Sequence, residues 1–198
     1  MPIYKSDESL GDIDSLRVST FSRSLGTEYQ DQPVAIIDAV SGQTITRKEL
    51  RDKALRFAYG LRNLSKFGKG EDLKRGDMVS VFSINTLDYP VVILGAFAAG
   101  VRIALSSPVQ TPKELAHQLK LTMPSFFVVH PAVLPVFVGT MKLIGIGMDQ
   151  YMKRTVLMET DVAKVPQSLR NWTLLSDLMK RDQQIVVERF DGPAASAV

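Results

Sequence analysis

The chain has 198 residues, of which 45% are hydrophobic and 23% are charged, and its formal net charge at neutral pH is only +3. This composition is typical of a globular domain and excludes the disordered and fibrous classes. The weak positive charge gives no basis for nucleic-acid binding, which needs lysines and arginines gathered on one face. The densest basic stretch, Lys66–Arg75, is interrupted by acids and glycines and is interpreted as a solvated loop.

The chain has no cysteine. Disulfides, thiolate zinc sites and cysteine nucleophiles are therefore excluded, and a reducing compartment is favoured. The first residues, Met1–Asp14, lack the apolar core of a signal peptide, and no run reaches the roughly 18 apolar residues of a membrane span. The last residues, Ala194–Val198, carry no peroxisomal tripeptide. We therefore expect a soluble, cytoplasmic protein with no membrane span.

Strand-like and helix-like segments alternate from about Pro33 onward, which favours an α/β fold with a mainly parallel sheet. Two short strand-like segments, Val34–Asp38 and Gln43–Thr46, flank a turn-rich connection and predict a hairpin. The amphipathic segment that follows predicts a helix. Thr46, with Glu49 three residues later, predicts a capping box at the start of that helix.

The middle of the chain continues the alternation. A buried strand is predicted over Asp77–Ile84, and a helix over Asp88–Gly100, whose small residues permit close packing on a sheet and whose final glycine suits a left-handed helix end. Another strand is predicted over Val101–Ser106. After it, Thr111–Glu114 supplies an N-cap, a first-turn proline and a capping-box acid, which predicts a tight passage into the next helix.

The last part of the chain predicts two more strands, Pro124–His130 and Arg154–Glu159. A helix between them begins or kinks near Pro135, and a final helix covers Trp172–Arg181. This order of elements predicts a doubly wound, mainly parallel sheet with flanking helices.

Motifs that carry chemistry are missing from the sequence. No G-x-x-x-x-G-K-[ST] phosphate loop is present, and no G-x-G-x-x-G opens a helix. His117 and His130 fall in different predicted elements without supporting ligands, so they are interpreted as an exposed helix residue and a strand-end residue. Ser106 and Ser107 lack a nucleophile elbow and are interpreted as turn residues.

Carboxylate pairs are equally poor candidates. Glu71 and Asp72 lie in a loop between lysines, and Asp177 lies on a predicted helix surface. None of them has a second carboxylate at a spacing that supports acid–base catalysis. The sequence therefore predicts no catalytic residue, no cofactor-binding residue and no metal ligand on this chain.

The order of segments nevertheless resembles a known family. Residues 35–64, 73–120 and 124–130, taken together at their spacing, strongly resemble the adenylate-forming acyl-CoA synthetase (AMP-binding) family, in its coumarate–CoA ligase-like branch. Met1–Ser6 looks like the start of fungal members. The positions that match the family pattern are Thr46, Glu49, Leu50, Gly76, Asp77, Asn85, Gly95, Gly100, Pro108, Thr111 and Glu114. Arg47 replaces a usual tyrosine, and Ser106–Ser107 stand where Asn-Pro or Asp-Pro is common.

The resemblance implies the N-terminal portion of a ligase, with residues 1–192 as a partial subdomain and 193–198 as a frayed tail. Members of the family use Mg-ATP to convert a carboxylate to an acyl-adenylate and then to an acyl-CoA thioester. Their phosphate loop ending in Pro-Lys, Thr-Glu element, ribose-binding Asp and C-terminal lysine have no match in these 198 residues. ATP, magnesium and coenzyme A are therefore implied for a complete member only.

Three hypotheses follow. The first is an N-terminal fragment, inactive alone, whose partners are the remaining ligase segments. The second is a non-catalytic paralogue that binds a full-length ligase, and the third is an unrelated small α/β domain. For the fragment, we expect Val91–Phe97 and Phe126–Val129 to be poorly covered and an unpaired strand edge to promote self-association.

Overall fold

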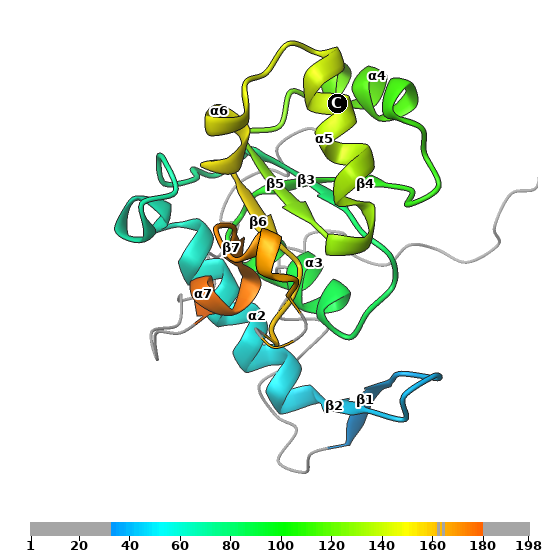
Figure 1. Cartoon of the computed structure of the whole chain (residues 1–198). Coiled ribbons are helices and arrows are strands. Elements are labelled where there is room, and N and C mark those ends of the chain that lie inside the picture. Colours follow the sequence, from blue (N-terminus) through cyan, green and yellow to red (C-terminus); the bar gives the residue numbers. More distant parts are fainter. Residues whose placement is uncertain (1–32, 162, 164, 180–198) are drawn as a thin grey trace, which may run out of the picture.

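The computed structural model describes residues 33–161, 163 and 165–179 (Figure 1). It begins with an antiparallel hairpin of β1 (Val34–Ile37) and β2 (Thr44–Thr46). The Asp38 carboxylate closes the turn by accepting hydrogen bonds from the backbone amides of Val40 and Ser41, at 2.9 and 2.8 Å. The hairpin predicted from the turn-rich connection is confirmed.

The main sheet has five parallel strands in the order β4-β3-β5-β6-β7. Their bounds are β3 (Met78–Phe82), β4 (Arg102–Ser106), β5 (Phe126–Val129), β6 (Thr155–Leu157) and β7 (Thr173–Leu174). The chain moves from β3 outward to β4, then crosses back over β3 to β5 and continues in the opposite direction. Because the winding reverses at this point, the sheet is doubly wound, as predicted.

Helices cover both faces of this sheet (Figure 1). One layer consists of α2 (Arg47–Leu61), α3 (Asp88–Ala98) and α7 (Leu175–Met179). The other consists of α4 (Pro112–Thr122), α5 (Leu134–Leu143) and α6 (Met148–Met152). The described connections also include the short 3-10 helices η2 (Leu64–Phe67), η3 (Pro131–Val133) and η5 (Gln167–Leu169).

Each helical layer closes its own apolar core against the sheet. Val79 and Val81 of β3 face the first layer, whereas the alternate residue Phe82 faces the second, where it joins Phe127 and Phe137. Each face of the sheet therefore has its own buried apolar core among the described residues. Within this part of the chain every helix is too short or too polar to traverse a bilayer.

Both predicted capping boxes are confirmed. The amide of Glu49 donates to the Thr46 hydroxyl at 3.2 Å, and the amide of Thr46 donates to the Glu49 carboxylate at 2.8 Å. The same exchange joins Thr111 and Glu114, with distances of 3.4 and 2.8 Å. Gly100 follows α3 with a φ of 70°, the left-handed helix end that was predicted for it.

One small residue of α3 departs from the prediction, whereas Ala96 and Ala98 are buried in the core that this layer shares with the sheet. Gly95 was expected to allow packing on the sheet, but its bare backbone faces α2. A Cβ at Gly95 would lie 2.7 Å from both the carbonyl oxygen of Ala54 and Cδ1 of Phe57. The two helices therefore approach more closely at this point than any side chain would allow.

Two further expectations are corrected, and one helix had not been predicted. The helix predicted over Trp172–Arg181 begins later, at Leu175, because Thr173 and Leu174 pair with β6 as strand β7. Lys180 and Arg181, at the end of the predicted helix, lie outside the described residues. The short helix α6 was not predicted. Phe126–Val129, expected to be poorly covered, is buried throughout because helices lie on both sides of β5. The tail 193–198 also lies outside the described residues.

Candidate functional site

A crevice opens at the carboxyl ends of β3, β5 and β6. Open parallel sheets form ligand sites where the winding reverses, because the loops that leave the two neighbouring strands diverge there. In this chain the reversal lies between β3 and β5. The cavity at this edge has a volume of about 380 Å³ and is walled by the hairpin turn, the start of α3 and the residues that follow β5 and β6.

His130 follows β5 directly and lines this crevice. Its Nδ1 accepts a hydrogen bond from the amide of Ala132 at 3.1 Å, so in the neutral ring the proton resides on Nε2. The imidazole is half-buried. Burial lowers the pKa of His130, and the carboxylates of Glu159 and Asp88 partly oppose this effect. His130 is therefore a neutral hydrogen-bonding group near physiological pH.

The two carboxylates near His130 are held by Thr160. Oδ2 of Asp88 accepts from the Thr160 hydroxyl at 3.2 Å, and Oε1 of Glu159 accepts from the amides of Thr160 and Asp161, both at 2.9 Å. These bonds orient the acids of α3 and of the segment after β6 toward one crevice. The arrangement can bind a polar ligand or exchange a proton. It does not form a metal centre, since no three potential ligands converge within the described residues.

The residues considered from sequence are placed as follows. His117 is exposed on α4, and Ser107 is exposed in the turn after β4, as interpreted. Ser106 is buried, and its hydroxyl has no hydrogen-bond partner within the described chain. The structure brings none of the three to the crevice.

Two of the three acids considered from sequence have structural roles, and the third, Glu71, lines the larger cleft described below. Asp72 accepts a hydrogen bond from the amide of Ser65 at 2.8 Å, and Asp177 accepts one from the amide of Leu174 at 2.9 Å. The group that sequence reasoning undervalued is His130, interpreted only as a strand-end residue. The rule that polar groups gather after parallel strands at a switch point could have identified it.

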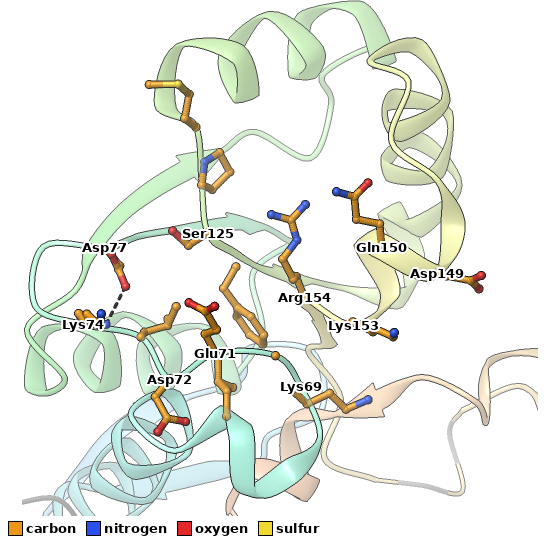
Figure 2. Close-up of a pocket in the computed structure, with 16 residues that line it drawn as sticks. Lys69, Glu71, Asp72, Lys74, Asp77, Ser125, Asp149, Gln150, Lys153 and Arg154 are labelled. Carbon is orange, nitrogen blue, oxygen red and sulfur yellow. Dashed lines mark hydrogen bonds between the residues drawn. The ribbon is translucent and has the colours of Figure 1, made fainter.

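A second, larger cleft of about 870 Å³ lies at the opposite, amino edge of the same sheet (Figure 2). One wall is the loop 69–77 before β3. The other is formed by α6 and by Lys153 and Arg154, which precede β6. Figure 2 shows charged side chains of both signs around this cleft.

The sequence profile of a family described as AMP-binding enzyme matches residues 25–189. The chain belongs to the AMP-binding enzyme family. The match covers most of the chain and includes every strand of the parallel sheet, so the resemblance inferred from the motif order is confirmed.

Relatives of this chain include proteins named as CoA ligases or as ligase-like. A long-chain-fatty-acid–CoA ligase of Salmonella typhimurium is 36% identical over 93 residues, which are 47% of this chain and 15% of that protein. A 4-coumarate–CoA ligase-like protein of Arabidopsis thaliana is 26% identical over 169 residues, which are 85% of this chain and 27% of that protein. The chain therefore spans only a small part of the length of either relative.

The fold is similar to that of solved structures. The structure of the luciferase-like enzyme from the mealworm Zophobas morio superposes with a TM-score of 0.72 at 16% identity. This superposition covers 96% of this chain and 41% of that one. At such low identity the likeness concerns the fold, and it confirms the predicted architecture.

Proposed function

We propose that this chain supplies the N-terminal part of the large domain of an ATP-dependent acyl- or aryl-CoA ligase. In this reaction a carboxylate becomes an acyl-adenylate and then a CoA thioester. The observation that carries the proposal is the family match over residues 25–189, together with relatives that are CoA ligases extending far beyond the matched region. Residues 1–192 are proposed to form the partial subdomain.

The described residues do not suit the chemistry of ATP. Adenylate formation requires preorganised positive charge around the triphosphate. The crevice at the carboxyl edge instead carries the acids Asp38, Asp88 and Glu159 around a single lysine, Lys53. Burial also keeps His130 neutral by lowering its pKa. The groups that line this crevice therefore do not fit a bound nucleotide triphosphate, and we propose that this chain alone does not catalyse adenylation.

An apolar surface supports a role as part of a larger assembly. Phe97 on α3 is exposed, and Ile93 on the same face of that helix is only half-buried. Leu105 on the edge strand β4 is 48% exposed, and its register with Val81 places it on the side of the sheet that α3 covers. Apolar groups and a strand edge on one side of a domain are typical of a surface that another segment covers.

A pyrophosphate-exchange assay tests the proposal. The purified 198-residue chain is incubated with ATP, magnesium and coumarate, a medium-chain fatty acid or acetate, beside a complete CoA ligase as positive control. We expect no carboxylate-dependent exchange. Exchange above the enzyme-free blank with any of the three acids would contradict the proposal that the catalytic groups lie elsewhere.

The two buried cores favour a second candidate function. Since each face of the sheet has its own buried apolar core among the described residues, the chain could persist as a non-catalytic partner that binds a full-length ligase through the apolar surface at Phe97 and Leu105. Co-purification with a complete CoA ligase from the same source would support this function. Transcript sequence that continues in frame into a Ser/Thr/Gly-rich phosphate loop would instead support the N-terminal portion of one ligase.

A further inference from the structure

The two outermost strands of the parallel sheet, β4 and β7, differ in how well their outer edges are protected (Figure 1). β7 has only two residues, both buried, and the amide of Leu174 donates to the Asp177 carboxylate at 2.9 Å. β4 has five residues, and no described strand pairs with its outer side. Proteins keep edge strands short, charged or covered, because unpaired backbone groups bind other strands. β7 follows this rule, whereas β4 departs from it.

The backbone groups of Ile103 and Leu105 face the outer side of β4. The amide of Arg102 donates to the Asp77 carbonyl at 2.8 Å, so every second residue from Arg102 onward turns its backbone groups toward β3. Ile103 and Leu105, which alternate with these residues, turn theirs outward. A side chain of α4 supports this direction, because Nε2 of Gln118 donates to the Leu105 carbonyl at 2.9 Å. A carbonyl oxygen can accept two hydrogen bonds, so a second donor can still bind there.

The side chains of β4 give this edge little protection. Its single charged residue, Arg102, is the first of the strand, and its Nε donates to the Gly76 carbonyl at 2.6 Å. The next three residues are apolar, and Leu105 is exposed. Ile103 and Leu105 lie on the side of the sheet that α3 covers, where Phe97 is also exposed. A strand approaching β4 would therefore meet outward backbone groups beside an apolar strip.

We infer that the outer edge of β4 pairs antiparallel with β4 of a second copy of this chain. A two-fold axis at Ala104 sets Ile103 of each copy opposite Leu105 of the other. Both residues turn their backbone groups outward, so each such pair can exchange N–H and C=O hydrogen bonds. The apolar side chains of each pair lie on the same face of the sheet, and cross-strand pairs of this kind stabilise antiparallel strands.

The charge pattern of β4 favours this partner and this direction. In the antiparallel arrangement the arginines at position 102 lie at opposite ends of the paired strands, each opposite the uncharged Ser106 of the other copy. A parallel arrangement would bring the two arginines together, and like charges on neighbouring strands are destabilising. The rest of the strand carries no charge that would select a partner strand of opposite charge. A second copy therefore matches the backbone, the apolar side chains and the charge of this edge together.

Sedimentation of the purified 198-residue chain over a range of concentrations tests the inference. We expect a monomer–dimer equilibrium. Leu105→Lys sets a charge opposite Ile103 of the other copy and should raise the dissociation constant at least about tenfold. Leu143→Lys makes the same change at an exposed leucine of α5 and should leave the dissociation constant unchanged. Circular dichroism checks that both variants are folded.

Hydrogen exchange in the wild-type chain distinguishes strand pairing from other contacts without any variant. The amide of Leu105 should exchange more slowly as the concentration rises, whereas the amide of Ala104, which faces β3, should be protected throughout. The inference is overturned if the chain stays monomeric, if Leu105→Lys associates as the wild type does, or if a dimer forms without slower exchange at Leu105. It is also overturned if exchange at Leu105 slows only when a complete CoA ligase is added. The inference uses the same exposed surface as the proposed function, but the pyrophosphate-exchange assay does not measure association, so the two can fail separately.

Discussion

Replacing Gly95 with alanine tests the close approach of α2 and α3. The added methyl group would lie 2.7 Å from the Ala54 carbonyl oxygen and from Cδ1 of Phe57. Alanine gains about 1 kcal/mol over glycine from helix propensity, but inserting a methyl group into a packed interface costs about 1–3 kcal/mol. Since one of the two contacts is a backbone atom that cannot rotate away, we expect Gly95→Ala to destabilise the fold by about 1–2 kcal/mol net.

Gly139 in the middle of α5 provides the matched control. A Cβ there would meet Pro112 Cγ at 3.5 Å, an ordinary contact, so Gly139→Ala should stabilise the chain by the propensity alone, about 0.5–1 kcal/mol. For a chain of this size, each kcal/mol shifts the unfolding temperature by about 2–4 °C. Thermal unfolding followed by circular dichroism should therefore rank Gly139→Ala above wild type and Gly95→Ala below it. A Gly95→Ala protein as stable as wild type would refute the proposed helix contact.

Three other predictions follow from the same structure. Thr111→Ala removes the N-cap of α4 and should cost about 1 kcal/mol in urea unfolding, whereas Thr122→Ala at the other end of that helix should cost less. Burial lowers the pKa of His130 below 6.5, so the unfolded chain binds more protons than the folded chain as the pH falls. The free energy of unfolding should therefore decrease as the pH drops below about 6.5. The urea midpoint of His130→Gln should decrease less than that of the wild type over the same range. Phe97→Ser should reduce light scattering and hydrophobic-dye binding by the isolated chain. A wild-type protein that is monodisperse and binds no dye would contradict the proposal that the exposed apolar surface of α3 and β4 is normally covered by another segment.

The elements predicted correctly from sequence are those with local signals. Thr46–Glu49 and Thr111–Glu114 define helix starts within four residues, and the apolar run of β3 defines a strand buried on both faces. Strand β7 could not be found in this way. Its two residues are a strand only because Val156 and Leu157 of β6 lie beside them, and a helix-forming segment follows at once.

The two candidate sites, like β7, depend on contacts between distant segments and so have no local signal in the sequence. No motif marks the crevice, because His130, Asp88 and Glu159 come from three separate segments and meet only through the strand order. The amino-edge cleft likewise depends on a loop before β3 and a turn before β6, which are distant in the sequence. The basic stretch Lys66–Arg75 is a loop from Gly68 onward, as interpreted from its composition, whereas Lys66 and Phe67 end η2. Sequence patterns gave no sign that Arg154 lies across the cleft from this loop.

The contact between α2 and α7 has a consequence for synthesis on the ribosome. A Cβ at Gly60 in α2 would lie 2.8 Å from Cβ of Leu178 in α7, so one of the first helices to be made packs directly against the last described one. Leu61 of α2 and Leu175 and Leu178 of α7 share one core. A nascent chain that lacks α7 therefore leaves part of α2 uncovered until nearly all of the described residues have emerged. Until Leu178 leaves the exit tunnel, the part of α2 that packs against α7 in the folded chain has no cover from that helix.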